Sequence, residues 1–231
     1  MVDPKYIKLS YWFDRIYVIN RPDRPVRLAR FFKHIEELGL AERHEVIVYP
    51  AIMGNKTTCP PYFLAGAGAW GCLKSHSNII ENAIMEIEIK GETHGIDSIL
   101  ILEDDVQFID DPYQLIFNFL SNIPKDWDQL YLGGQHRMKP IATENSEIKR
   151  VISTNRTHAY ALNSKIYKKV YAHINNATDY IGRKDYHVDG QLEEAHRKQA
   201  WNVYCPPKWL AGQCANISDV SNTEIPYKIW D

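Results

Sequence analysis

The stretch that decides the fold reads Ser98-Ile99-Leu100-Ile101-Leu102-Glu103-Asp104-Asp105-Val106. Its four consecutive apolar residues, rich in Ile and Leu, are followed at once by three acids. This pattern predicts a short strand that is buried on both faces. In open α/β sheets, ligands bind beyond the carboxyl ends of the strands, so the three acids are expected to meet a ligand or a metal ion.

The direction of the three acidic side chains depends on where the strand ends. If strand geometry continues, side chains alternate, and Glu103 and Asp105 point to one side while Asp104 points to the other. Two carboxylates that converge on one point repel each other unless a cation lies between them, and hard oxygen ligands suit Mg²⁺ or Mn²⁺. The alternative is a solvated turn after a core strand, with Asp110 or Asp111 capping the next helix.

Length and composition set the broad class. The 231 residues include 45% apolar and 24% charged residues, which is typical of a globular protein and fits one domain over residues 1–231. A net charge of −2 offers no electrostatic footprint for nucleic acid. Neither a signal peptide nor an apolar run of membrane-spanning length is visible, which predicts a cytoplasmic protein. The four cysteines form no C-x-x-C pair, which argues against a structural zinc site and predicts reduced thiols.

The first strand and helix are expected to form an anion-binding turn. Residues 14–20 have the β-branched and aromatic character of a strand, and the apolar spacing over 23–38 predicts an amphipathic helix. Asn20, Asp23, Arg24 and Arg27 then lie at the strand-to-helix turn, where helix N-terminal amides and guanidinium groups favour an anion such as a diphosphate. The alternative is that the arginines belong to a solvated helix face.

Strands and helices alternate along the rest of the chain. Ser75 and His76 fall in the first turns of a helix expected over 69–90, which follows a long loop over 51–68. The segments 151–153 and 158–162 are expected to pair as strands, whereas 135–146 is polar and irregular. Further strands are expected at 45–49, 127–132, 201–204 and 209–211, and further helices at 112–120, 164–174 and 186–198. This alternation predicts a single α/β domain.

Five blocks of sequence occur in a characteristic order. They are Ile16-Tyr17-Val18-Ile19-Asn20 with Asp23, Arg24 and Arg27; Gly71-Cys72-Leu73-Lys74-Ser75-His76; Leu102-Glu103-Asp104-Asp105-Val106; Asp128-Gln129-Leu130-Tyr131-Leu132-Gly133; and Val188-Asp189. Together with the segments 157–162 and 213–219, they resemble glycosyltransferase family 25. This family includes bacterial lipooligosaccharide galactosyltransferases and collagen hydroxylysine galactosyltransferases. The resemblance covers residues 14 to about 220.

The resemblance implies a glycosyltransferase-A fold, in which a Rossmann-like mixed sheet is flanked by helices, together with a UDP-sugar donor and a Mn²⁺ or Mg²⁺ ion. Glu103-Asp104-Asp105 takes the place of the DxD motif of such enzymes, so Glu103 and Asp105 are the expected metal ligands. A metal that bridges the donor diphosphate stabilises the charge that builds as the glycosidic bond breaks. The residues expected on the donor side are Ile19, Asn20, Arg24, Arg27, Ser75, His76 and Asp104.

The resemblance also implies an inverting reaction, because known members of the family generally invert the anomeric centre. A single displacement asks for a base that takes the acceptor proton, and Asp189 is the candidate. The alternative role of Asp189 is that of a helix N-cap. Many glycosyltransferase-A enzymes complete the metal shell with a late histidine, which here leaves His187, His196 or neither.

The leading hypothesis is therefore a metal-dependent transferase that moves a hexose from a UDP-sugar to a hydroxyl of a glycan, a hydroxylysine or another acceptor. A second hypothesis is a glycoside hydrolase in which Asp105 and Asp189 serve as acid and base and which needs no divalent ion. A third is a nucleotide-sugar-binding protein without turnover. The sequence leaves the donor sugar, the acceptor and the oligomeric state open.

Overall fold

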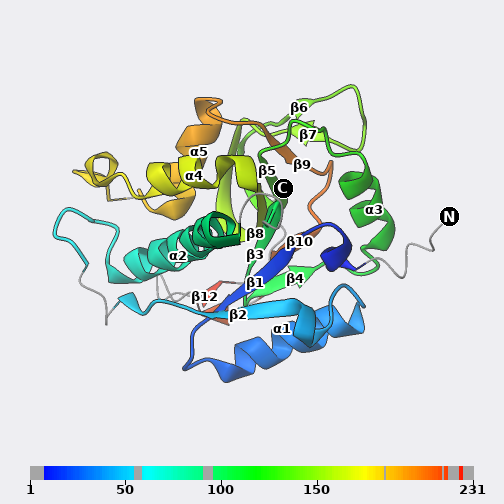
Figure 1. Cartoon of the computed structure of the whole chain (residues 1–231), viewed down its shortest axis with the longest axis horizontal. Coiled ribbons are helices and arrows are strands. Elements are labelled where there is room, and N and C mark those ends of the chain that lie inside the picture. The colour runs from blue at the N-terminus through cyan, green and yellow to red at the C-terminus, as the bar shows by residue number, and fades with distance from the viewer. Residues whose placement is uncertain are drawn as a thin grey trace.

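A sheet of eight strands forms the centre of the molecule (Figure 1). The computed structural model describes residues 8–54, 59–90, 96–184, 186–214, 216–217 and 224–225. The strand order is β2-β1-β3-β8-β5-β9-β7-β6. The bounds of these strands are β1 Arg15–Asn20, β2 Val46–Pro50, β3 Ser98–Glu103, β5 Gln129–Met138, β6 Ile141–Ala142, β7 Lys149–Arg150, β8 Ser153–Asn163 and β9 Val203–Cys205.

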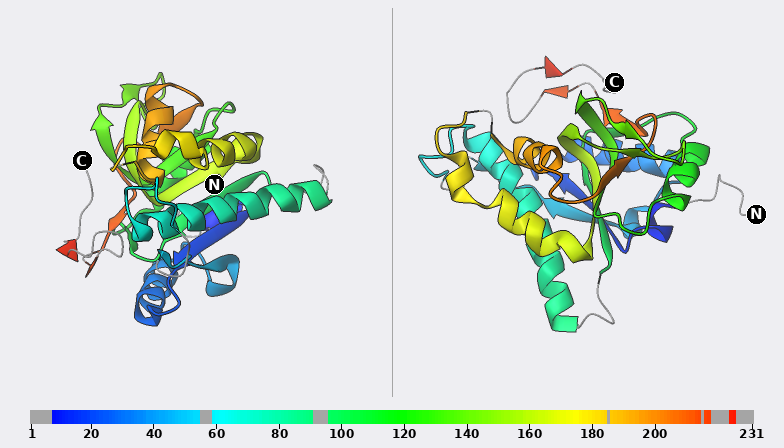
Figure 2. Two further views of the ribbon diagram at one scale, coloured as in Figure 1. Left: turned by 90° about the vertical axis from the view of Figure 1, so that its left-hand side faces the viewer. Right: turned by 90° about the horizontal axis from the view of Figure 1, so that it is seen from above.

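Helices pack against both faces of this sheet (Figure 2). The α-helices of the described ranges are α1 Pro25–Glu37, α2 Ala67–Lys90, α3 Tyr113–Ser121, α4 Tyr167–Ile174 and α5 Val188–Arg197. Short 3-10 turns lie at Leu9–Tyr11, Arg43–Glu45, Ser164–Ile166 and Ala177–Tyr180. Within the part of the chain that the structure describes, no helix combines the length and the apolar character that a membrane crossing requires.

The sheet is mixed, as the resemblance implied. β1 runs parallel to both β2 and β3, whereas β8 lies between β3 and β5 and runs antiparallel to both. β5 in turn runs parallel to β9. The expected α/β class, with a Rossmann-like mixed sheet flanked by helices, is confirmed by this arrangement.

The alternation of side chains along β3 separates two hydrophobic layers. Ile99 and Ile101 pack with the buried side chains of α2, α4 and α5, whereas Leu100 and Leu102 pack with those of α1 and α3. All four side chains are fully buried. Each stabilises the fold by roughly 1.5–3 kcal/mol through burial of apolar surface. The strand is therefore held between two cores, and its register is fixed because a shift by one residue would exchange the two faces.

β3 ends at Glu103, and the chain turns at Asp104 and Asp105. The expected alternation of side-chain directions therefore holds for two of the acids: Glu103 points to the side of α2 and Asp104 to the side of α1. It does not hold for Asp105, because the turn interrupts the strand before β4 (Val106–Phe108) begins. The prediction that Glu103 and Asp105 point together, which assumed a continuing strand, is wrong for this reason.

A small second sheet brings the end of the chain to the acidic turn. β4 pairs antiparallel with β10 (Ala211–Gln213), with Gln213 opposite Val106. The backbone N–H of Cys214 then donates to the carbonyl of Asp105 at 2.8 Å. A third pair, β11 Asn216–Ile217 with β12 Glu224–Ile225, follows in the chain.

The element boundaries differ from the predictions mainly around β5 and β8. β5 continues to Met138, into the segment that was expected to be irregular. The segments 151–153 and 158–162 do not pair with each other, because Ser153 and residues 158–162 belong to the same strand, β8. Arg156, at φ 78°, lies in the middle of that strand, where its pairing with β5 shifts register.

Candidate functional site

The acidic turn lies beside the end of β1, because β1 and β3 are parallel neighbours whose carboxyl ends meet at one edge of the sheet. The backbone N–H of Asp104 donates to the carbonyl of Ile19 at 3.2 Å. The Asn20 amide donates to the Asp104 carboxylate at 2.5 Å and to the carbonyl of Arg24 at 3.2 Å. These contacts join the turn after β3 to the turn that leads into α1.

Arg27, in the first turn of α1, neutralises part of the acidic turn. Its guanidinium forms an ion pair with Asp104 and another with Asp105 at 3.3 Å. The three side chains are 13%, 6% and 12% exposed, so these pairs are shielded from water. Arg24 is half-buried at the start of the same helix. Of the two arginines expected on the donor side, Arg27 thus already faces carboxylates of the protein itself.

Asp105 is the acid of the turn whose charge is least compensated. One carboxylate oxygen, Oδ2, accepts a long hydrogen bond of 3.4 Å from Gln213, whereas the other, Oδ1, is buried and has no hydrogen-bond partner among the described residues. Burial, and after it the charge of Glu103, raises the pKa of Asp105 to about 7, although Arg27 acts in the opposite direction. A buried carboxylate of this kind gains from an additional cation.

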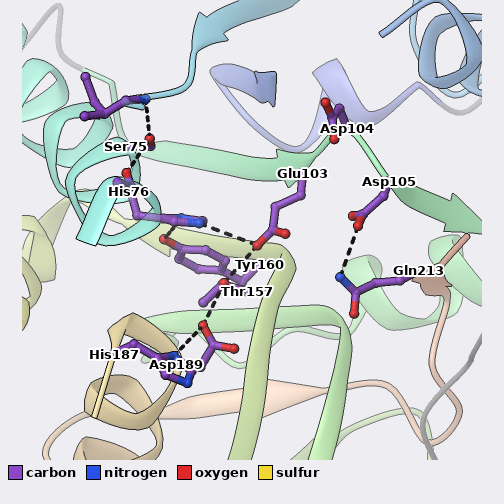
Figure 3. A network of polar contacts seen from close by, with 12 residues as sticks. Ser75, His76, Glu103, Asp104, Asp105, Thr157, Tyr160, His187, Asp189 and Gln213 are labelled. Atoms are coloured by element: carbon purple, nitrogen blue, oxygen red, sulfur yellow. Dashed lines mark hydrogen bonds and ion pairs between the residues drawn. The ribbon is translucent and has the colours of Figure 1, made fainter. Parts of the chain in front are cut away.

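Glu103 points to the other side of β3, toward His76 and Thr157 (Figure 3). Its carboxylate lies 2.9 Å from the hydroxyl of Thr157, which also lies 3.1 Å from the carboxylate of Asp189. A hydroxyl carries one hydrogen and can donate it to only one of the two carboxylates at a time. The Thr157 hydroxyl therefore lies between two negatively charged carboxylates, and only one of them receives its hydrogen bond at a time.

Both bridged carboxylates are ionised at neutral pH. Burial opposes ionisation of Glu103, but its contact with His76 outweighs burial and lowers the pKa. Burial likewise opposes ionisation of Asp189, yet the contact with His187, whose Nδ1 lies 3.6 Å from Oδ1 of Asp189, lowers its pKa to about 2. Asp189 lies in the first turn of α5.

Ser75 and His76 lie on the buried side of α2 but serve different neighbours. The hydroxyl of Ser75 donates to the carbonyl of Gly71 and accepts from the backbone N–H of Ile52, both at 2.8 Å, so it holds the preceding loop to the helix. His76 turns toward the sheet, with Nδ1 3.0 Å from the hydroxyl of Tyr160 and Nε2 3.6 Å from Glu103. The structure therefore brings His76 to the acids and leaves Ser75 in a structural position.

The two late histidines have different environments. His196 is 1% exposed, and its Nε2 lies 3.1 Å from the amide oxygen of Gln129. Burial lowers the pKa of His196 to about 3, so it is a neutral core residue. His187 is half-buried next to Asp189. Of the two, only His187 lies beside a carboxylate of the site.

Three residues of the site had no role in the sequence analysis. Thr157, Tyr160 and Gln213 belong to the two segments that resembled the family without matching one of its five blocks. Thr157 and Tyr160 come from β8, and Gln213 comes from β10. The resemblance of these segments to the family indicated that they matter for function. The contacts of the individual side chains could not be predicted, because they depend on which strands lie next to each other.

The donor groups at this edge fit a divalent ion. Oδ1 of Asp105 is buried without a partner among the described residues, whereas the carboxylate of Glu103 is turned toward His76 and Thr157. Carboxylate oxygens are the ligands that Mg²⁺ and Mn²⁺ prefer. Asp105 thus offers a suitable ligand atom beside Asp104 and Arg27, and Glu103 would join it by turning away from His76.

Comparison with known proteins supports the resemblance seen in the sequence. No protein-family model matches the chain. A "Procollagen lysyl hydroxylase and glycosyltransferase" of Acanthamoeba polyphaga mimivirus is 28% identical over 177 residues, which is 67% of this chain and 19% of that protein. A "Glycosyltransferase 25 family member" of Aedes aegypti is 28% identical over 151 residues, which is 56% of this chain and 23% of that protein. The chain thus spans about a fifth of the length of these relatives.

Among solved structures, the chain is similar to a mutant of Drosophila beta1,4-galactosyltransferase 7 in complex with manganese, UDP-Gal and xylobiose. The TM-score is 0.40 and the identity is 13%, over 91% of this chain and 68% of that one. The two sequence relatives confirm the resemblance to glycosyltransferase family 25.

Proposed function

We propose that this chain, whose sequence is similar to members of glycosyltransferase family 25, transfers a hexose from a UDP-sugar to a hydroxyl acceptor with inversion at the anomeric carbon. The observation that carries the proposal is the buried acidic turn at the joined ends of β1 and β3, where Oδ1 of Asp105 has no hydrogen-bond partner among the described residues. Such a turn gains from a cation in addition to Arg27, and a nucleotide sugar is a ligand that brings one. The expectation of one domain over residues 1–231 belongs to the same proposal.

Glu103 and Asp105 are the residues that would hold Mn²⁺ or Mg²⁺, with the Glu103 carboxylate turning from His76 toward Asp105. When bound, such an ion neutralises the charge that grows on the diphosphate leaving group. Arg27 keeps Asp104 and Asp105 at the turn through its two ion pairs. Without that guanidinium, the neighbouring carboxylates would repel each other and the turn would lose its shape.

The donor is placed at the turn between β1 and α1. The Asn20 side chain connects this turn to Asp104, and the carbonyl of Ile19 accepts the hydrogen bond from the backbone N–H of Asp104, which holds the acidic turn beside the end of β1. Arg24, at the start of α1, would bind the diphosphate, because a helix N-terminus favours an anion. His76 lies on the opposite side of Glu103 and orients that carboxylate.

Asp189 would take the proton of the acceptor hydroxyl. In a single displacement, the acceptor oxygen attacks the anomeric carbon, the bond to the diphosphate breaks, and its electron pair leaves with UDP. With a pKa of about 2, Asp189 is ionised and ready to accept the proton, but it is a weak base. Proton transfer should therefore occur late, when bond formation has made the acceptor oxygen acidic. Thr157 holds Asp189 in place.

The experiment is a screen of UDP-sugars for metal-dependent release of UDP, with and without EDTA, followed by acceptors that include glycans and hydroxylysine peptides. UDP release that requires Mn²⁺ or Mg²⁺ is expected with one of the sugars. Release of sugar from a simple glycoside in EDTA would instead identify a hydrolase. Metal-dependent UDP binding without turnover on any acceptor would identify a binding protein.

Matched variants assign the roles. Asp105→Asn should abolish metal-dependent UDP binding, because it removes a ligand charge. Asp189→Asn should retain donor binding and reduce turnover by about 10²- to 10⁴-fold, the usual contribution of a positioned base. Asp111→Asn removes an exposed carboxylate a few residues past the turn and should change neither property. Normal Mn²⁺ dependence in Asp105→Asn would contradict the proposed metal site.

A further inference from the structure

A second group of potential ligand atoms lies on the α2 side of Glu103. Sγ of Cys72, a ring nitrogen of His76 and a carboxylate oxygen of Glu103 all lie within 4.8 Å of one another. Cys72 and His76 are four residues apart on α2, so the helix presents them on the same face. Sulfur, nitrogen and oxygen therefore converge from one helix and one strand.

The histidine of this group points a buried ring nitrogen into it. His76 is 1% exposed, and its Nε2 is buried without a hydrogen-bond partner among the described residues. The nearest charged atom, Oε1 of Glu103, is 3.6 Å away, which is too far for a hydrogen bond. A buried ring nitrogen without a partner is costly, and a metal ion at this point would satisfy it.

The neighbouring contacts orient these side chains as in known metal sites. The other ring nitrogen of His76, Nδ1, lies 3.0 Å from the hydroxyl of Tyr160. Glu103 is held in turn by the hydroxyl of Thr157 at 2.9 Å. Histidine ligands of metals usually bind a second group through the other nitrogen, which fixes the tautomer and the ring orientation. The group has this arrangement.

We propose that Cys72, His76 and Glu103 form a binding site for a soft divalent ion of the Zn²⁺ type, with a fourth position left open. Thiolate and imidazole select Zn²⁺ over Mg²⁺ and Mn²⁺, and three protein ligands with one open position are typical of zinc sites that exchange their fourth ligand. Metal–ligand bonds of about 2.0–2.3 Å require the three atoms to approach one another by about 1 Å. Binding converts the thiol to a thiolate and releases one proton to solvent.

The surrounding charge favours a dication. Glu103 belongs to the group, and the hydroxyl of Thr157 lies between its carboxylate and that of Asp189, at 2.9 and 3.1 Å. These two carboxylates attract a metal ion. A consequence rests on the proposed function: an ion bound here would keep Glu103 turned away from the donor site, so Zn²⁺ would inhibit the transferase.

Cobalt(II) is the probe, because a cobalt–thiolate bond gives a near-ultraviolet charge-transfer band that oxygen ligands do not give. The reduced, metal-free protein is titrated with Co²⁺, and one equivalent should produce the band, which Zn²⁺ then removes. Cys72→Ser should lose the band. Cys59→Ser, which removes another half-buried thiol, should keep it. Tyr160→Phe should weaken Co²⁺ binding by about 10- to 100-fold, the usual effect of losing a group that orients a ligand.

Two further measurements keep the test independent of folding and of the transferase. Asp105→Asn should retain the cobalt band, which separates this site from the donor ion and leaves the inference intact if the transferase proposal fails. In the unaltered protein, Zn²⁺ should protect Cys72 but not Cys59 from alkylation, measured by mass spectrometry. Absence of the band in the unaltered protein, or equal alkylation of Cys72 with and without Zn²⁺, would overturn the inference.

Discussion

Replacement of Arg27 by methionine tests how the acidic turn is held. Methionine keeps much of the length of the side chain and removes the charge that faces Asp104 and Asp105. If Arg27 mainly compensates these carboxylates, its loss should destabilise the protein before any donor is bound. If it belongs to a solvated helix face, the change should have little effect.

The magnitude follows from burial. Removing one partner of a buried ion pair costs about 3–5 kcal/mol, because the remaining charge is left in a poorly solvated place. Asn20 still donates to Asp104 and Gln213 to Asp105, which favours the lower end, about 3 kcal/mol. Since the pKa of Asp105 is about 7, this carboxyl takes up a proton at pH 6 and part of the cost disappears. The destabilisation should therefore be larger at pH 8 than at pH 6.

Urea unfolding in EDTA, followed by tryptophan fluorescence at both pH values, measures the change. The slope with urea must stay constant for the comparison of free energies of unfolding to hold. Arg30→Met, an exposed arginine on the same helix, is the control and should stay within about 0.5 kcal/mol of the parent protein. In an Asp105→Asn background, the cost of Arg27→Met should fall by about 1–3 kcal/mol, because the two groups are in contact.

Addition of Mn²⁺ should restore part of the lost stability, because a bound ion replaces the missing positive charge. A ligand present at 100 times its dissociation constant raises the free energy of unfolding by about 2.7 kcal/mol. The reasoning is refuted if Arg27→Met costs no more than Arg30→Met at pH 8. It is also refuted if the cost is unchanged in the Asp105→Asn background.

Three further predictions concern neighbouring contacts. The pKa of Asp105 is about 7 in the folded protein and 3.8 when unperturbed, so the folded state binds more protons than the unfolded state between these pH values. The free energy of unfolding should therefore fall, by at most about 4 kcal/mol, as the pH rises from about 4 to 7. Asp105→Asn should remove most of this pH dependence in urea titrations. Ser75→Ala leaves the backbone N–H of Ile52 without its acceptor and should lower the free energy of unfolding by about 1–3 kcal/mol, measured by thermal denaturation. Thr157→Val removes the hydroxyl that bridges the two carboxylates and should lower turnover at least about 10-fold with donor affinity less affected, whereas Thr157→Ser should restore turnover.

The sequence predicted the parts of the fold that follow from local pattern. The apolar run of β3, the helix after β1 and the position of Asn20 beside the acids all follow from periodicity and from the rule that parallel strands end at one edge. The direction of Asp105 does not follow, because it depends on the residue at which the strand ends. A change of one residue in that boundary moves a side chain to the opposite face.

The site contacts of Thr157 could not be predicted for a different reason. They require β8 to lie between β3 and β5 and to pass through an irregular register at Arg156, whose φ is 78°. A polar residue with such a backbone angle breaks the alternation that sequence analysis relies on. His196 illustrates the same limit, since its sequence neighbourhood resembles that of a surface helix, whereas Gln129 and Trp201 enclose it in the core.

Glu103 is the residue on which both proposed cation positions depend. It ends β3, on the face that carries Ile99 and Ile101, and contacts His76 and Thr157 there, while its charge also acts on Asp105 across the turn. A hard ion would draw it toward the oxygens of Asp105, and a soft ion would draw it toward Cys72 and His76. Because one carboxylate has two oxygens but a single orientation, occupation of one position should weaken the other. The ratio of Zn²⁺ to Mn²⁺ would then regulate the activity through a single side chain at the end of the central strand.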